Sequence, residues 1–277
     1  MKYDLHSHTT CSDGRLTPQA LLDRAVDNDV GVLAITDHDT VKAINIAKQY
    51  IDDKQLDMTL ISGVEISTSW ANHEIHIVGL CVDANDSQLI ERLAGQINYR
   101  NERAQLIGER LERAGIPQAY ENAKRIAADA AVSRSHYAKY LIELGKAKDF
   151  GGVFKKYMKR GKPGYVSSQW IDPKTAIQWI HDAGGIAVLA HPSRYDLSAK
   201  WLKRLLADFK RFGGDAMEVA LSQQSPQERA LLGQYAKDYE LLASVGSDFH
   251  FPTNWCELGK NLYLSDKYLP VWHNWQI

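Results

Sequence analysis

The chain has 277 residues, of which 44 % are hydrophobic and 24 % are charged, and its formal net charge at pH 7 is −1. These values are typical of one α/β domain, with or without an insert, and they exclude the global basic field that drives non-specific binding of nucleic acid. Three distant cysteines predict no disulfide framework, and no apolar run reaches the roughly 18 residues that span a bilayer, so we expect a cytoplasmic protein with neither a signal peptide nor a membrane partner.

Seven short segments rich in Val, Ile, Leu and Ala predict β-strands. They are 3–6, 31–36, 59–66, 74–80, 185–190, 216–220 and 241–245. Near-continuous apolar runs are typical of parallel strands that are buried on both faces. Helical stretches lie between many of them, and Thr17-Pro18 and Asp172-Pro173 predict two helix N-termini. The order predicts an α/β fold, a (β/α) barrel or a barrel-like fold, whose functional site lies at the C-terminal ends of the strands.

Residues 87–164 interrupt this alternation. They contain no convincing strand, and 87–114 and 122–145 predict helices. We therefore expect residues 1–86 and 165–277 to form the barrel and 87–164 to form a helical insert that caps its C-terminal mouth.

Histidines and acidic residues recur at the ends of the predicted strands. They are His6, His8, Asp37, His38, Glu65, His191, Asp248 and His250. Asp13 closely follows the segment that carries His6 and His8, and His76 lies inside its strand. Imidazole and carboxylate are ligands that Zn, Mn and Fe accept. Taken singly, each residue is explained about as well by a buried side chain with ordinary hydrogen bonds. The ordered set, spread over the whole chain, predicts one polynuclear metal centre.

The same motifs resemble the polymerase and histidinol phosphatase (PHP) family of metal-dependent phosphoesterases. The matching segments are His6-Ser7-His8-Thr9 with Asp13-Gly14, Thr36-Asp37-His38-Asp39, His191-Pro192 and Ser247-Asp248-Phe249-His250. Within the family, the chain is most similar to the branch of nucleoside 3′,5′-bisphosphate phosphatases and 5′→3′ exoribonucleases of the RNase AM type. Ser133-Arg134-Ser135-His136 and His191-Pro192-Ser193-Arg194-Tyr195 carry that similarity.

The resemblance implies a trinuclear site in a distorted (β/α)7 barrel. It places His6, His8, Glu65 and Asp248 on a first metal, and Glu65 with His76 and His191 on a second. A third metal takes Asp13, His38 and His250, and Asp37 is expected to orient a ligand. From the resemblance we expect two or three Mn²⁺ ions, with Fe or Zn possible in one position.

Phosphate oxygens also need cationic partners, and the planar guanidinium of Arg matches their geometry. Arg194 lies three residues after His191, so we expect it near the metals. Arg134 and His136 are expected to contribute to substrate binding from the insert. The alternative for both arginines is a surface salt bridge.

These residues predict hydrolysis of phosphate esters by metal-bound hydroxide, with no protein nucleophile, and the resemblance implies that the esters are those of nucleotides. The expected substrates are the 3′-phosphate of nucleoside 3′,5′-bisphosphates and short single-stranded RNA, and no protein partner is predicted. One alternative is a histidinol-phosphate or other small-molecule phosphatase of the same family. A second alternative is a non-catalytic, metal-binding accessory domain.

Overall fold

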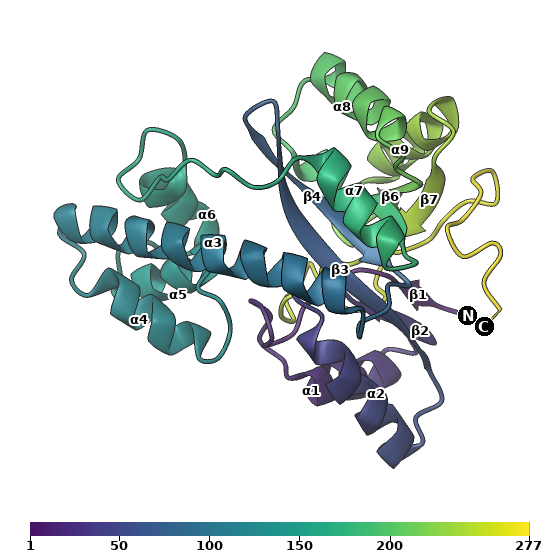
Figure 1. The fold of residues 1–277 in the computed structure, drawn as a ribbon, viewed down its shortest axis with the longest axis horizontal. Helices are drawn as coiled ribbons and strands as arrows, with labels where there is room; N and C mark the ends of the chain where they lie inside the picture. The colour runs from purple at the N-terminus through teal and green to yellow at the C-terminus, as the bar shows by residue number, and fades with distance from the viewer. Residues whose placement is uncertain (277) are drawn as a thin grey trace. The chain divides into compact units, whose positions relative to one another are not determined.

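The computed structural model describes residues 1–276, and its central feature is a seven-stranded sheet in the order β1-β2-β3-β4-β5-β6-β7 (Figure 1). The strands are β1 Tyr3–Asp4, β2 Val32–Ile35, β3 Thr59–Trp70, β4 His73–Leu80, β5 Ile186–Leu189, β6 Ala216–Ala220 and β7 Leu242–Val245. The first and last strands approach each other, because Leu5 N donates to Val245 O and Ser7 bridges to Phe249. The sheet is therefore nearly closed, and the predicted seven-stranded α/β barrel is confirmed.

The hairpin of β3 and β4 departs from the predicted alternation of strand and helix. β1 to β3 are parallel, and so are β5 to β7, but β4 is antiparallel to both of its neighbours. Only Ala71 and Asn72 connect β3 to β4, and both have positive φ, 46° and 66°. A two-residue turn of this kind joins antiparallel strands, because a parallel connection needs a crossover of a dozen or more residues.

Five α-helices pack around the barrel. They are α1 Pro18–Asp27, α2 Lys42–Lys54, α7 Pro173–Asp182, α8 Ala199–Arg211 and α9 Pro226–Asp238, and the short 3-10 helix η2 Pro192–Arg194 follows β5. Thr17 and Asp172 cap α1 and α7 as predicted, because their side chains accept from Ala20 N and Thr175 N. The core between helices and sheet includes Leu22, and the strands bury a second group of side chains inside the barrel.

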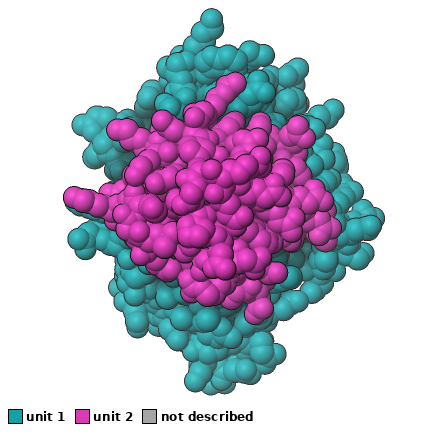
Figure 2. Space-filling model, turned by 90° about the vertical axis from the view of Figure 1, so that its left-hand side faces the viewer, with its two compact units in different colours: residues 1–93, 171–277 teal, residues 94–170 magenta. Residues whose placement is uncertain are grey.

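The chain divides into two compact units, coloured separately in Figure 2. Residues 1–93 and 171–277 form the barrel unit, and residues 94–170 form a helical unit. The helical unit holds α4 Ala119–Ala127, α5 Arg134–Glu143, α6 Phe150–Val153 and the π-helix η1 Phe154–Met158, and α3 Ser87–Arg113 begins in the barrel unit and ends in this one. It has its own hydrophobic core around the fully buried Tyr137, whose hydroxyl donates to Ala104 O.

Among residues 1–276, no helix combines the length and the apolar character required to cross a membrane.

Candidate metal centre

Nine predicted ligands come together at one end of the barrel. His6 and His8 follow β1, His38 follows β2, His191 follows β5, and Asp248 and His250 follow β7. Glu65 and His76 lie within the hairpin strands. Because β4 runs opposite to its neighbours, its N-terminal half lies beside the C-terminal ends of the parallel strands. This reversal explains why His76 reaches the same place from inside a strand.

Four donor atoms converge in the most buried part of the cluster. His6 Nε2 lies 3.1 Å from His8 Nε2, and these nitrogens lie 3.4 and 3.3 Å from Glu65 Oε2. Asp248 Oδ1 lies 3.4 Å from His6 Nε2 and 3.1 Å from His8 Nε2. Donors that share one ion at about 2.0–2.2 Å lie about 3–3.6 Å apart. The spacing of the four atoms fits a single metal ion.

Glu65 faces two groups of histidines through its two carboxylate oxygens. Its Oε2 lies 3.0 Å from His38 Nδ1 as well as near His6 and His8. Its Oε1 lies 2.9 Å from both His76 Nδ1 and His191 Nε2. A carboxylate placed in this way can bridge two ions.

A third group lies around Asp13. Its Oδ1 lies 3.1 Å from His250 Nε2 and 3.8 Å from His38 Nε2, and His8 stacks on His250 with a centroid distance of 4.1 Å. Together, His8, Asp13, His38 and His250 form another group with the donor spacing of a cation site.

Asp37 holds the loop that carries Asp13. Its carboxylate accepts from Thr9 N at 2.7 Å, from Thr9 Oγ1 at 2.6 Å and from Ser12 Oγ at 2.5 Å. The side chain is buried, and these bonds occupy both of its oxygens. We infer that Asp37 acts by positioning this loop, which agrees with the expectation that it orients a ligand.

Two buried polar atoms of the cluster show how a cation would fit there. Within the part of the chain that the structure describes, His38 Nδ1 and Glu65 Oε2 make no hydrogen bond, although they lie 3.0 Å apart. Each such buried atom costs about 1–3 kcal/mol. Lone pairs that face one another at 3.0–3.4 Å are satisfied by positive charge, so the residues present fit the metal centre that the sequence predicts.

The electrostatics of the site favour positive charge. Burial alone would raise the pKa of Glu65, but His38, His76 and His6 hold that pKa well below its ordinary value. Burial would lower the pKa of His8, but the carboxylates of Asp248 and Glu65, which lie 3.1 and 3.3 Å from its Nε2, raise the pKa to about 9. The carboxyl group of Glu65 is therefore ionised at neutral pH, and the imidazole of His8 attracts either a proton or a metal ion.

Glu218 contacts two of the predicted ligands, although the sequence did not assign it to the site. It lies in β6 with 1 % of its surface exposed. Its Oε1 lies 2.6 Å from His6 Nδ1, and its Oε2 accepts from the backbone N–H of His191. A carboxylate on the far nitrogen of a ligating histidine fixes the ring so that the other nitrogen presents a lone pair. The signal in the sequence was one acidic residue in the apolar run Ala-Met-Glu-Val-Ala, and it did not reveal the partner 212 residues away.

Tyr195 is a second residue whose place the sequence did not predict. His76 N donates to its hydroxyl at 2.9 Å, and its ring stands edge-on to His191 with a centroid distance of 5.3 Å. Tyr195 therefore packs against two of the predicted ligands. No pattern in the sequence pointed to this contact.

The three predicted substrate-binding residues lie in different units. In the barrel unit, Arg194 is the last residue of η2, which begins directly after His191. Its Nη1 forms an ion pair with Asp248 Oδ2. The helical unit contains Arg134 and His136 in the first turn of α5. His136 is 2 % exposed, and its Nδ1 accepts from Ser133 N at 3.0 Å in a capping box.

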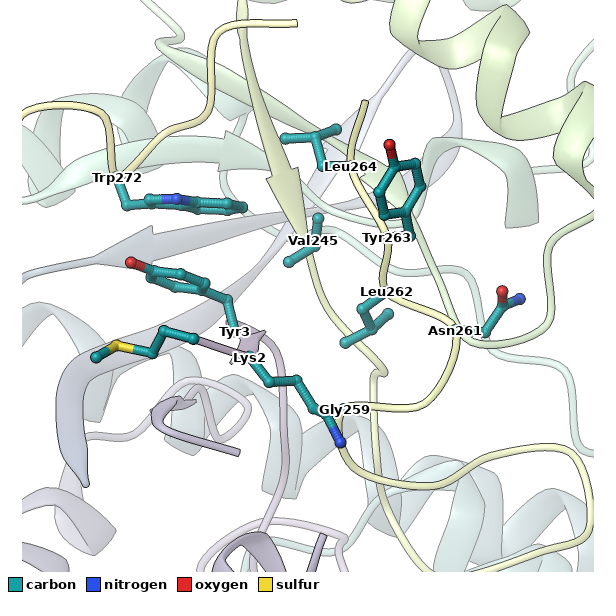
Figure 3. A pocket seen from close by; sticks show the side chains of 10 residues that line it. Lys2, Tyr3, Val245, Gly259, Asn261, Leu262, Tyr263, Leu264 and Trp272 are labelled. Carbon is teal, nitrogen blue, oxygen red and sulfur yellow. The ribbon is translucent and has the colours of Figure 1, made fainter. Parts of the chain in front are cut away.

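The barrel unit also has a cavity of about 670 Å³ between its N-terminal and C-terminal segments (Figure 3). In this cavity Tyr3 stacks on Trp272 with a centroid distance of 4.2 Å, and Tyr263 and Leu264 line another wall. None of the predicted site residues is among its described lining residues. The cavity is therefore separate from the histidine cluster.

The chain belongs to the PHP domain family, whose model matches residues 4–185. It is 57 % identical to the 5′-3′ exoribonuclease Rnm of Escherichia coli, over 99 % of this chain and 94 % of the relative. It is 41 % identical to the 3′,5′-nucleoside bisphosphate phosphatase of Chromobacterium violaceum, over 90 % of this chain and 87 % of the relative. The predicted family is therefore confirmed, and the two relatives carry the names of the predicted branch.

Two solved structures have the same fold. The structure of an amidohydrolase from Chromobacterium violaceum, with bound sulfate and no metal, superposes with a TM-score of 0.91 at 39 % identity, covering 98 % of this chain and 95 % of that one. A structure from Bifidobacterium adolescentis, provisionally described as a metal-dependent phosphoesterase, superposes with a TM-score of 0.82 at 26 % identity. The superposition covers 96 % of this chain and 93 % of that one. The likeness extends over nearly the whole chain, so it includes the helical unit as well as the barrel.

Proposed function

We propose that this protein is a metal-dependent phosphoesterase that hydrolyses nucleotide phosphate esters. The observation that carries the proposal is the group of His6, His8, Glu65 and Asp248, in which each histidine nitrogen lies 3.1–3.4 Å from the other and from both carboxylate oxygens. The expected bond cleavage separates phosphorus from a ribose 3′-oxygen, either in a nucleoside 3′,5′-bisphosphate or at the 5′ end of a short RNA. The exoribonuclease and bisphosphate phosphatase relatives support this choice of substrate.

We assign His6, His8, Glu65 and Asp248 to one ion, Glu65, His76 and His191 to a second, and Asp13, His38 and His250 to a third. His8 also borders the third group. A donor set of imidazole and carboxylate suits Mn²⁺, with Fe or Zn as an alternative in one position. When bound, the ions supply positive charge for the phosphate and lower the pKa of water.

The protein's own residues orient these groups. Glu218 fixes the ring of His6, and Asp37 fixes the loop that carries Asp13. Arg194 places a guanidinium beside Asp248 at the edge of the cluster, with 38 % of its side-chain surface exposed. Its remaining donors can hold a phosphate oxygen. We propose the same role for Arg134 and a supporting role for His136, from the helical unit.

Release of inorganic phosphate from adenosine 3′,5′-bisphosphate by the Mn²⁺-loaded protein tests the proposed function. Adenosine 5′-monophosphate and histidinol phosphate serve as comparison substrates. We expect rapid release from the bisphosphate alone. Release from histidinol phosphate alone would contradict the nucleotide assignment, and bound metal without any hydrolysis would favour an accessory domain.

Arg194→Ala tests the phosphate-binding role. We expect kcat/KM to fall at least about tenfold, because a charge-assisted hydrogen bond contributes about 1.5–3 kcal/mol, while metal content stays unchanged. Arg92→Ala is a matched control, since it removes an arginine that pairs with an aspartate, Asp182, on the outer surface of the barrel unit. Activity of Arg194→Ala equal to that of the control would contradict the assignment.

A further inference from the structure

A cluster of aromatic and cationic side chains lies on the outer wall of the barrel, at the tip of the β3–β4 hairpin. Trp70 and His73 pair across the two-residue turn, and Trp201 and Arg204 reach them from α8. The ring centroid of Trp201 lies 5.7 Å from that of Trp70 and 6.0 Å from that of His73. All four residues belong to the barrel unit, and we call them the rim cluster.

The members of the rim cluster differ in exposure. Trp70 is 7 % exposed, and its Nε1 donates to Asp208 Oδ2 at 3.0 Å, so it anchors the hairpin to α8. Trp201 keeps 39 % of its surface exposed and is among the exposed large hydrophobic residues of the chain. The exposed Arg204 lies with its guanidinium carbon 5.1 Å from the Trp201 ring and 5.9 Å from the Trp70 ring. Packing accounts for Trp70 but leaves the outer surfaces of Trp201 and Arg204 open to solvent.

Helix α8 is strongly basic although the chain as a whole has a net charge of −1. Its thirteen residues include one acidic residue, Asp208, and five basic ones: Lys200, Lys203, Arg204, Lys210 and Arg211. All five basic residues are exposed. A locally positive surface that carries an exposed aromatic ring has the two properties that bind single-stranded nucleic acid, since cations follow the phosphates and rings stack on the bases.

The rim cluster lies close to the metal centre along the hairpin. His73 precedes the proposed ligand His76 by three residues in β4, which corresponds to about 10 Å of strand. The two side chains point to opposite faces of the strand, because the separation is an odd number of residues. A chain leaving the site past the hairpin tip would therefore reach Trp201 after the first few nucleotides, whereas a mononucleotide held at the metals would not.

We propose that Trp201 and Arg204 form a stacking site for bases of single-stranded RNA downstream of the scissile bond. The proposal rests on the proposed function and extends it, because the site would favour oligoribonucleotides over mononucleotides. Trp70 and Asp208 position the site, and the basic residues of α8 attract the phosphates. The ligand is single-stranded because a base inside a duplex does not offer its face to a side chain.

The test compares substrates of increasing length. kcat and KM are measured for adenosine 3′,5′-bisphosphate and for single-stranded RNAs of about 2 to 12 nucleotides, with the unaltered protein and Trp201→Ala. We expect Trp201→Ala to raise KM at least about fivefold for the longer RNAs, the smallest effect of losing one stacked base. The values for the bisphosphate and the dinucleotide should change less than about twofold, because neither reaches the rim cluster.

Three further variants separate stacking from charge and from loss of folding. Trp201→Phe should restore most of the affinity for long RNA. Arg204→Lys keeps the charge but loses the planar group, so it should weaken long RNA binding more than Arg211→Ala, which removes one charge from the last turn of the same helix. Equal melting temperatures would show that the folded state is intact in each variant.

Direct binding separates this proposal from the proposed function. Fluorescence anisotropy of a labelled 10-nucleotide RNA, measured in chelator, reports the rim cluster without catalysis. Weaker binding by Trp201→Ala to single strands, with duplex RNA little affected, is the expected result even if no substrate is hydrolysed. Equal affinities of Trp201→Ala and the unaltered protein, or an equal loss for duplex and single strand, would overturn the proposal.

Discussion

Replacing Glu218 by glutamine probes how the barrel prepares His6 for a metal ion. The carboxylate takes part in two interactions, with His6 Nδ1 at 2.6 Å and with the backbone N–H of His191. A glutamine side chain has a single carbonyl oxygen, so its NH₂ group must face one of these two donors. If it faces His6, the ring moves its proton to Nε2, the atom that points at His8 and Glu65.

The expected loss can be estimated from these contacts. Removing a carboxylate that supports a ligating histidine weakens metal binding about 10- to 100-fold. Losing one hydrogen bond to a buried charged group costs about 1.5–3 kcal/mol of stability. We therefore expect Glu218→Gln to bind Mn²⁺ at least about tenfold more weakly and to unfold at a lower urea concentration in its metal-free form.

Calorimetric titration with Mn²⁺ and urea denaturation of the metal-free protein measure the two effects. Glu228→Gln is the matched control, because Glu228 is exposed in the capping box of α9 and glutamine can replace it there. The control should change neither quantity by more than about 0.5 kcal/mol. Unchanged Mn²⁺ affinity in Glu218→Gln would refute the conclusion that this carboxylate sets the protonation of His6.

Three other predictions follow from the packing and the pKa values. Gly246→Ala should lower the free energy of unfolding, measured by urea denaturation, by at least about 1–3 kcal/mol, because the added Cβ would lie 2.3 Å from His6 Cβ. Gly95→Ala in α3, where open space surrounds the added Cβ, should raise this free energy by about 0.5–1 kcal/mol. Equal effects of the two substitutions would contradict this account. Burial raises the pKa of Cys256 to about 12, so iodoacetamide at pH 8 should modify it at least about tenfold more slowly in the folded protein than in urea, and mass spectrometry of the labelled peptide would reveal any faster reaction. His8 has a pKa raised to about 9, so at pH 7 it holds a proton that a metal ion must displace. The affinity for Mn²⁺ should therefore rise from pH 6 to pH 9, and binding should release protons. Calorimetric heats of binding that do not depend on the buffer would contradict this prediction.

The strands and most of the site could be predicted from the sequence because their signals are local. The buried apolar runs of β2 and β5 predict strands, and Thr17 and Asp172 predict the N-termini of the helices that they cap. Most of the candidate ligands could be recognised because they lie in or shortly after a predicted strand, and Asp13 because it follows the His6-Ser7-His8-Thr9 motif closely. Local patterns of this kind need no knowledge of which segments meet.

Pairings between distant segments could not be predicted in the same way. The apolar run of β4 does not say whether the strand is parallel or antiparallel, and only the short turn at Ala71 settles its direction. Glu218 meets His6 across 212 residues, and Arg194 meets Asp248 across 54. One sequence contains no signal for such contacts, since they depend on how the barrel closes.

The nearly closed ring of strands would give a bound metal ion a role in folding. Glu65 and His76 are only 11 residues apart in one hairpin, and such a contact can form early because it closes a short loop. His8 and Asp248 are 240 residues apart and meet only when the last strand reaches the first. An ion bound by both residues would hold the two ends of the barrel together. Removal of this ion should therefore weaken the contact between β1 and β7 before it affects the β3–β4 hairpin.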